Sequence, residues 1–310
     1  MNTKQKNTTI KGTIAIGIAA ILWGLDGVVL TPQLHNLDVG YVVFVLHLLP
    51  FLLMNLFFFK EIKKLTIMSK SDFFYFFLIS LFGGALGTIA IVKSLFLVNF
   101  NHLSVVVLLQ KLQPIFAILL ARIILKERIS KNFALWAGIA ITSGYLLAFG
   151  FHLPDTSGNG KELLYACLFA LLAAFSFGSS TVFSKKILGN YSFVTSTYYR
   201  YGFTSVIMLI YMVLWGNFSQ FSATTTNNLI FFIIIGLTTG AGAIFLYYYG
   251  LRNVKAIYSS IIELMFPISA VIFDYLIHGK IFTVTQWIAA SIMFFAIIKL
   301  NRNRIQKQKT

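Results

Sequence analysis

Long apolar runs separated by short polar connectors dominate the chain from Gly12 to Lys299. A helix needs about 20 apolar residues to cross the hydrocarbon core of a bilayer, and runs of this size predict ten membrane-spanning helices. The predicted spans are Gly12–Leu30, Gly40–Phe59, Phe73–Val98, Leu103–Leu125, Phe133–Phe151, Leu163–Phe183, Phe193–Trp215, Leu229–Leu251, Ile257–Ile277 and Ile281–Lys299. The first run is too long, and too closely followed by other spans, to be a cleaved signal peptide.

The composition also indicates a multi-pass membrane protein. Hydrophobic residues make up 58% of the chain and charged residues 11%, and the mean hydropathy is +0.82. Because a soluble domain carries about 25% charged residues, this chain lacks the charge to cover a normal water-facing surface. The single cysteine, Cys167, cannot form a disulfide within the chain. We predict no metal site and no cofactor.

The position of the basic residues predicts the orientation of the chain. Most of the 25 lysines and arginines lie near connectors on one side of the predicted bundle, whereas only Lys161 and Lys280 lie on the other side. Connectors rich in Lys and Arg face the cytoplasm, so we expect both termini to be cytoplasmic, in the inner membrane of a bacterium. The net charge of +16 is thereby explained, and nucleic acid is not an expected partner.

One stretch of the sequence occurs twice. Residues Leu103–Arg128 return in altered form at Ala256–Ile281, and Pro114 of the first copy matches Pro267 of the second. A mid-segment proline in a long apolar run is typical of kinked or discontinuous membrane helices that line a polar pathway. The chain is therefore expected to consist of two related halves.

The two expected domains are residues 1–151 and 152–310, joined by a Pro- and Gly-containing linker at His152–Lys161. Each would hold five spans. Because five is odd, the second half must enter the membrane upside down relative to the first. Inverted repeats are the architecture of alternating-access transporters, with the substrate near the midplane. We thus expect an all-α membrane protein of two inverted five-helix repeats around a central cavity.

Short motifs occur in a consistent order along both halves. They are Ile21–Gly24, Gly83–Gly84, Pro114 and Leu125–Arg128 in the first half, and Gly250–Arg252 and Pro267 in the second. This ordered set resembles the EamA-like transporter family of the drug/metabolite transporter superfamily, from about Lys11 to Leu300. The resemblance implies a ten-helix bundle with an inverted repeat and secondary transport of small metabolites, often the export of amino acids or related compounds.

Polar and ionisable side chains inside a span are costly unless they are paired or hydrated, so they are candidates for the transport pathway. The candidates for substrate binding or for lining the cavity are Asp26, His47, Lys93, Gln110, Lys111, Gln113, Arg200 and Glu263. Glu263 and Asp26 are also the candidates for proton coupling. Pro114 and Pro267 are expected to kink their helices. Further candidates for lining are the tyrosines Tyr198, Tyr199, Tyr201 and Tyr247–Tyr249.

Depth along the helices predicts how these groups meet. Arg200 and Glu263 lie at similar depths from the cytoplasmic face, so we expect them to form an ion pair, because either charge alone would be costly. A second, mostly cationic cluster toward the outer face is expected from Asp26, His47, Lys93 and Lys111. The alternatives are that Lys93 extends to the headgroups, that Gln110 and Gln113 only join helices, and that His47 serves packing.

The expected function is secondary active transport of a small polar metabolite, an amino acid or a related organic anion or zwitterion, across the inner membrane. Transport would proceed by alternating access, coupled to protons or by exchange. No GxxxxGK[ST] loop is present, so the chain cannot hydrolyse ATP itself.

Two alternatives remain, a channel and a membrane-embedded lipid-modifying transferase. The transferase needs a catalytic constellation at one membrane face and leaves the repeat unexplained, so we do not expect an enzyme. The expected partners are the small-molecule substrate and the lipid bilayer. The oligomeric state is open between a monomer and a homodimer.

Overall fold

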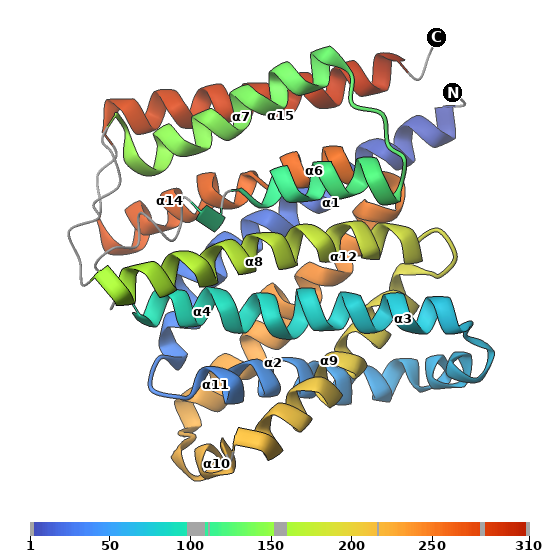
Figure 1. Ribbon diagram of the computed structural model, residues 1–310, viewed down its shortest axis with the longest axis vertical. Coiled ribbons are helices and arrows are strands. Elements are labelled where there is room, and N and C mark those ends of the chain that lie inside the picture. Colours follow the sequence, from blue (N-terminus) through green and yellow to red (C-terminus); the bar gives the residue numbers. More distant parts are fainter. Residues whose placement is uncertain are drawn as a thin grey trace.

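The computed structural model describes residues 3–97, 109–110, 112–151, 160–215, 217–279 and 283–307, and every regular element in these ranges is helical (Figure 1). Six helical segments are long and apolar enough to cross a membrane. They are Asn7–Leu34, Val39–Ile67, Lys70–Ser94, Gly160–Ile187, Thr226–Asn253 and Ala256–Ile277. Shorter apolar helices cover Gln113–Ile124 and Val284–Leu300. The expectation of an all-helical, multi-pass membrane protein is therefore confirmed.

In the first half of the chain the helices follow the predicted apolar runs. The elements are α1 (Thr3–Leu25), η1 (Asp26–Leu30), η2 (Thr31–Leu34), α2 (Val39–Phe58), η3 (Phe59–Ile67), α3 (Lys70–Ile79), η4 (Ser80–Leu86), α4 (Gly87–Leu97), α6 (Gln113–Ile124) and α7 (Lys131–Phe149). The expected span Leu103–Leu125 lies partly outside the described residues, and so does its candidate residue Lys111.

In the second half of the chain, the described elements begin at Gly160. Its elements are α8 (Gly160–Ile187), α9 (Phe193–Trp215), η5 (Asn217–Ser219), α10 (Gln220–Ala223), α11 (Thr226–Ile235), η6 (Gly236–Gly240), α12 (Ala241–Asn253), α13 (Ala256–Ile262), α14 (Met265–His278) and α15 (Val284–Lys307). Three of the short elements, η1, η4 and η6, are single π-helical segments within longer helices. Such segments are rare and occur often at functional sites.

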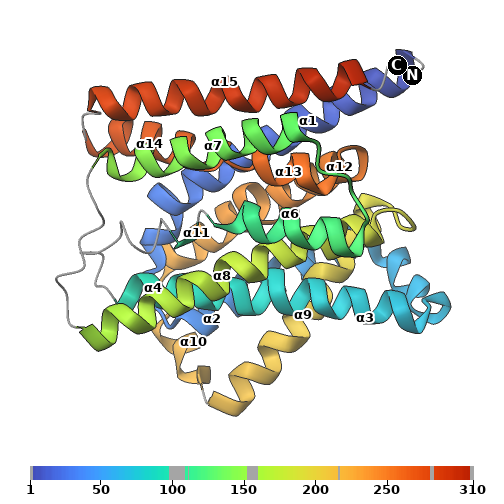
Figure 2. The same ribbon diagram turned by 45° about the horizontal axis from the view of Figure 1, so that its top comes forward.

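The helices pack in pairs that combine the two halves of the chain. Helix α1 packs along α12 and α14, whereas α8 packs along α4 and α6. Helices α2 and α9 form another pair, and α7 and α15 lie together at one edge of the bundle (Figures 1 and 2). The N-terminus and the C-terminus lie at the same end of the molecule (Figure 2).

Two glycines allow helices of opposite halves to approach closely. A Cβ atom at Gly24 of α1 would lie 2.8 Å from the backbone nitrogen of Ala270 in α14. A Cβ atom at Gly178 of α8 would lie 2.9 Å from the backbone oxygen of Gln113 in α6. Both contacts involve backbone atoms, which cannot move aside, so only glycine permits these crossings.

Polar caps start several helices. Asp38 accepts hydrogen bonds from the backbone nitrogens of Gly40 and Tyr41 at the start of α2. Similar caps are formed by Ser69 for α3, Ser130 for α7 and Thr225 for α11. Each cap satisfies backbone donors that the first helical turn leaves without a partner.

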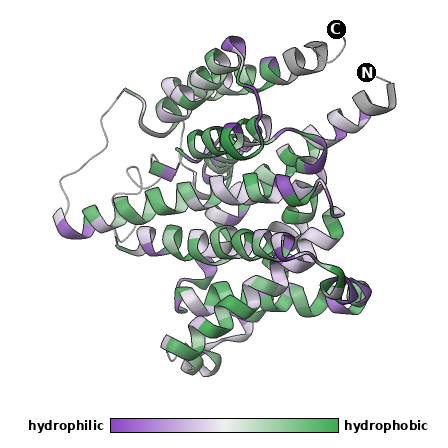
Figure 3. Cartoon of the chain, turned by 45° about the vertical axis from the view of Figure 1, so that its right-hand side comes forward, coloured by the Kyte–Doolittle hydropathy of each residue, from purple (hydrophilic) through white to green (hydrophobic). Residues whose placement is uncertain are grey.

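The outer faces of the helices are strongly apolar. Relative exposure is 70% for Leu56, 77% for Phe57 and 71% for Ile123. Figure 3 shows many apolar residues along the helices. A water-facing surface would not expose so many large apolar side chains, so these faces are suited to contact lipid.

Glu127 joins the two halves at the end of the molecule where the termini lie. It follows α6 in the Leu125–Arg128 motif, and its Oε1 and Oε2 accept hydrogen bonds from the backbone nitrogens of Ala256 (3.0 Å) and Ile257 (3.1 Å). These donors belong to the first turn of α13, where a negative charge is also favoured by the helix dipole. The carboxylate therefore acts as a cap supplied by the other half of the chain.

Replacing Glu127 by alanine should destabilise the protein, because two backbone donors at the start of α13 would lose their charged acceptor. We expect the free energy of unfolding to fall by about 1–2 kcal/mol. Reversible unfolding in mixed micelles would measure the change. The control is Arg128→Ala, which removes an exposed neighbouring charge and should have little effect. Equal stability of Glu127→Ala and Arg128→Ala would contradict the capping role.

Candidate functional site

The candidate site lies where two helices are interrupted. Helix α13 ends at Ile262 and α14 begins at Met265, so Glu263 lies in the turn between them. The first turn of α6 begins at Gln113, with Pro114 as its second residue. Pro114 and Pro267 thus follow helix interruptions, and the polar residues Gln113 and Glu263 lie at them.

The carboxylate of Glu263 accepts hydrogen bonds from three neutral side chains. Gln113 Nε2 donates to Oε2 at 2.9 Å, and the Tyr247 hydroxyl donates to Oε1 at 2.7 Å. Ser259 Oγ donates to Oε1 at 3.3 Å. Among the described residues, no ion pair involves Glu263. The negative charge is therefore stabilised by dipoles drawn from both halves of the chain.

Tyr247 places an aromatic ring beside this carboxylate. Its ring centroid lies 5.3 Å from that of Trp23 in α1, and its hydroxyl also lies 2.8 Å from Thr181 Oγ1 in α8. Tyr247 itself is almost fully buried, whereas Trp23, Gln113 and Glu263 are each only half-buried. The site thus combines aromatic faces with amide, hydroxyl and carboxylate groups.

Arg200 has a different set of partners. It is 8% exposed, and its Nη2 donates to the Gly83 carbonyl of η4 at 2.7 Å. Its Nη1 donates to the Tyr248 hydroxyl at 3.1 Å and to Ser180 Oγ at 3.5 Å. No described residue accepts a hydrogen bond from Arg200 Nε. The guanidinium group therefore joins α9 and α12 to the π-helical segment η4.

The expected ion pair between Arg200 and Glu263 does not form. The adjacent residues Tyr247 and Tyr248 of α12 each bind one of the two charged groups, with ring centroids 5.9 Å apart. Arg200 and Glu263 each form hydrogen bonds with a tyrosine hydroxyl and with other neutral groups. These bonds stabilise both charges without an ion pair between them. The two groups are linked through neighbouring residues of one helix instead.

Asp26 lies in the π-helical segment η1. Its Oδ1 accepts a hydrogen bond from Thr239 Oγ1 of η6 at 2.9 Å, and its Oδ2 accepts one from Thr31 Oγ1 at 3.0 Å. The side chain is half-buried. Asp26 therefore connects two π-helical segments from opposite halves of the chain.

The described members of the expected outer cluster do not share partners. His47 Nδ1 lies 2.8 Å from the Val43 carbonyl, and its ring centroid lies 5.2 Å from that of Tyr201. Lys93 is exposed, with Nζ 5.7 Å from the ring centroid of Phe169. A long side chain on an exposed helix face can extend to the headgroups. Among the described members, Asp26, His47 and Lys93 are thus held by separate groups.

Several residues of the site do not stand out in the sequence. Tyr247 was one of six candidate tyrosines, but Trp23, Thr181 and Thr239 were not candidates at all. A single threonine or tryptophan in an apolar helix usually serves packing or an interhelical hydrogen bond. Only the spatial neighbourhood of Glu263 and Asp26 distinguishes them. Gln110 is half-buried in the short described segment before α6.

The sequence matches the EamA-like transporter family over residues 10–149 and again over residues 164–302. The chain belongs to the EamA-like transporter family. The resemblance drawn from the short motifs is therefore confirmed, and the protein is a transporter rather than an enzyme.

Three curated relatives are similar to this chain. A "Riboflavin transporter ImpX" from Fusobacterium nucleatum subsp. nucleatum is 51% identical over 294 residues, covering 94% of this chain and 98% of the relative. An "Uncharacterized transporter" from Clostridium kluyveri is 29% identical over 60% of this chain and 59% of the relative. Another from Archaeoglobus fulgidus is 22% identical over 64% of this chain and 67% of the relative.

One solved crystal structure is also similar. It is 12% identical and superposes with a TM-score of 0.71, covering 96% of this chain and 99% of that chain. At this identity the likeness shows the fold alone.

Tyr247→Phe should weaken the site, because Glu263 loses a hydroxyl donor while the aromatic ring stays. We expect a loss of about 1–2 kcal/mol in the free energy of unfolding, measured in mixed micelles. A double-mutant cycle with Glu263→Gln should give a coupling energy of about 1 kcal/mol. In the control cycle, Tyr249→Phe with Glu263→Gln, the two effects should add. Additivity in the Tyr247 cycle would show that its hydroxyl does not stabilise the carboxylate.

Proposed function

We propose that this transporter carries riboflavin or a closely related flavin. The observation that carries this proposal is the 51% identity with the riboflavin transporter of Fusobacterium nucleatum across almost the whole of both chains. The site chemistry supports it. A flavin presents a flat aromatic ring system, a polar edge with hydrogen-bond donors and acceptors, and a hydroxylated side chain. Trp23, which packs on the buried ring of Tyr247, offers a partly accessible aromatic face, while Gln113 and Glu263 offer complementary polar groups.

The proposed substrate replaces the amino acid or organic anion expected from the sequence. The amino acid was expected from the family resemblance, and the organic anion from a cationic outer cluster whose described members have separate partners in the fold. The groups at the interrupted helices are predominantly neutral or acidic, and they include aromatic rings. Such a set suits a neutral aromatic solute with several hydroxyl and amide-like groups better than a small anion.

We infer a ten-span architecture of two inverted repeats, residues 1–151 and 152–310. The packing supports it, because α1 lies against α12 and α14 just as α8 lies against α4 and α6. If each helix is replaced by the equivalent helix of the other half, the contacts of α1 become the contacts of α8. The separate family matches to residues 10–149 and 164–302 provide a second, independent support.

A central cavity follows from the same proposal. The side chains of Trp23, Asp26, Gln113 and Glu263 keep part of their surface accessible. Yet their hydrogen bonds and ring contacts connect helices from both halves. Accessible polar groups between the repeats are what a midplane substrate site requires. Alternating access would open this cavity first to one side of the membrane and then to the other.

Both termini are proposed to be cytoplasmic, in the inner membrane of a bacterium. The concentration of Lys and Arg at one end supports this orientation. The two termini also lie at the same end of the molecule (Figure 1). Cysteine labelling that reached the two termini from opposite sides of the membrane would contradict the topology.

Transport of radiolabelled riboflavin into proteoliposomes tests the substrate. We expect saturable uptake, counterflow when unlabelled riboflavin is loaded inside, and competition by unlabelled riboflavin but not by a mixture of amino acids. Liposomes without protein provide the control. Flux that does not saturate and shows no counterflow would indicate a channel. Saturable amino acid uptake without riboflavin uptake would contradict the proposed substrate.

Proton coupling through Glu263 is the proposed energy source. An ionised carboxylate in the bilayer interior is costly without a cation, and protonation or a substrate donor would offset that cost. Glu263→Gln should abolish uptake driven by a pH gradient and spare counterflow, because exchange needs no net proton movement. The control is Glu162→Gln, an exposed carboxylate at the start of α8. Normal gradient-driven uptake by Glu263→Gln would exclude this coupling.

A further inference from the structure

The connector between α2 and α3 is a 3₁₀ helix with three distinct faces. This helix, η3, covers the nine residues Phe59–Ile67. A 3₁₀ helix has three residues per turn, so residues three apart lie on the same face. One face carries Glu61, Lys64 and, at its exposed end, Ile67. The second carries Phe59, Ile62 and Leu65, and the third carries Lys60, Lys63 and Thr66. The three faces differ in chemistry and in burial.

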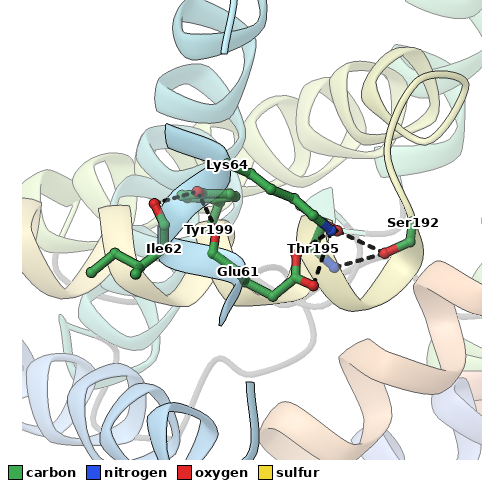
Figure 4. A network of polar contacts seen from close by, with 6 residues as sticks. All are labelled: Glu61, Ile62, Lys64, Ser192, Thr195 and Tyr199. Atoms are coloured by element: carbon green, nitrogen blue, oxygen red, sulfur yellow. Dashed lines mark hydrogen bonds and ion pairs between the residues drawn. The ribbon is translucent and has the colours of Figure 1, made fainter. Parts of the chain in front are cut away.

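The face with Glu61 and Lys64 is held against the protein. Lys64 Nζ lies 2.7 Å from Glu61 Oε2 and donates to Thr195 Oγ1 of α9 at 3.0 Å. The Tyr199 hydroxyl donates to the Glu61 carbonyl at 2.7 Å. Figure 4 shows this network, in which Ser192 also contacts Thr195 at 2.7 Å. These contacts fix the rotation of η3, and hence the direction of its other two faces.

The second face is apolar and exposed. Relative exposure is 56% for Phe59, 54% for Ile62 and 44% for Leu65. The exposed Leu56 and Phe57 at the end of α2 precede this face directly. An exposed apolar surface of this kind marks a contact with lipid or protein, and here it continues the outer surface of a membrane-spanning segment.

The third face supplies positive charge beside the apolar one. Lys60 and Lys63 are both exposed, and Lys70 is exposed at the start of α3. Each of these side chains has an apolar stem that can lie along the acyl region while the ammonium group stays at the headgroups. Basic residues beside an exposed apolar stripe are the pattern of a helix lying in the membrane interface.

We propose that η3 lies in the membrane interface and binds anionic phospholipid, with its apolar face among the acyl chains and Lys60 and Lys63 at the headgroup phosphates. η3 forms the last part of the segment Val39–Ile67, directly before the next spanning segment begins at Lys70, and this position places it at the membrane surface. The two exposed lysines complement the negative headgroups of an anionic leaflet. A second protein is a weaker match, because the apolar face is continuous with the lipid-facing surface of α2.

Bound lipid would also act on the transport pathway. The inner face of η3 contacts Thr195 and Tyr199, and Tyr199 directly precedes the buried Arg200 in α9. Lipid that holds η3 in place therefore stabilises the start of the helix that positions Arg200. Transport should accordingly be faster in membranes that contain anionic lipid.

A fluorescent probe on η3 tests the binding. Cys167 is the only cysteine, so Ile62→Cys in a Cys167→Ala background accepts one environment-sensitive label in the full-length transporter. We compare its quenching by spin-labelled phosphatidylglycerol and phosphatidylcholine in proteoliposomes. We expect stronger quenching by phosphatidylglycerol. Lys60→Gln with Lys63→Gln should reduce this preference about fivefold for each lysine removed.

The matched control removes two other exposed charges at the end of the molecule where the termini lie, Arg128→Gln with Lys131→Gln, and should keep the preference. Gel filtration confirms that each variant is folded. Equal quenching by both lipids would overturn anionic-lipid binding, and a probe that only water reaches would overturn the interfacial position. An equal loss of preference in the control pair would show general surface charge instead of a site on η3.

Discussion

Charged groups inside the lipid bilayer need polar partners, and this requirement shapes the centre of the molecule. Glu263 has three neutral donors, and Arg200 has a backbone carbonyl and two hydroxyl oxygens. Hydrogen bonds of this kind lower the cost of burial without cancelling the charge. A carboxylate held in this way can still exchange its donors for those of a substrate, or accept a proton. A direct ion pair would leave less freedom for either.

The same partners connect the two halves of the chain. Gln113 of α6 reaches Glu263 between α13 and α14, and Arg200 of α9 reaches Gly83 of η4. Asp26 of η1 reaches Thr239 of η6. Movement of one half against the other must therefore change the surroundings of each charged group. In the proposed alternating-access mechanism, this links the binding of substrate or of a proton to a conformational change.

The two halves contain similar π-helical segments that bind different side chains. The segments η4 and η6 are both π-helical, and the glycine pair Gly83–Gly84 of η4 is echoed by the glycines of η6. Yet η4 is held by the cation Arg200, whereas η6 is held by the anion Asp26. Two similar π-helical segments thus bind side chains of opposite charge. The proposed flavin substrate has no internal symmetry, which is compatible with such a site.

The sequence by itself determined the class of the molecule. The length and spacing of the apolar runs predicted helices, because a helix satisfies its backbone groups within one span and needs about 20 residues to cross the bilayer. Ordered motifs such as Ile21–Gly24 and Leu125–Arg128 identified the EamA-like family. The candidates Gln113 and Glu263 were also visible, since polar residues stand out in apolar runs.

Tertiary structure alone decided which groups meet. Depth along the helices suggested that Arg200 and Glu263 would pair, but depth does not give the rotation of a helix or the side chains between two charges. In the fold, the Tyr247 hydroxyl binds Glu263 and the Tyr248 hydroxyl binds Arg200. Trp23, Thr181 and Thr239 gain their roles in the same way, through neighbours distant in the chain. Hydrophobic periodicity records which residues avoid water, whereas the partner of a buried polar group depends on how the helices pack.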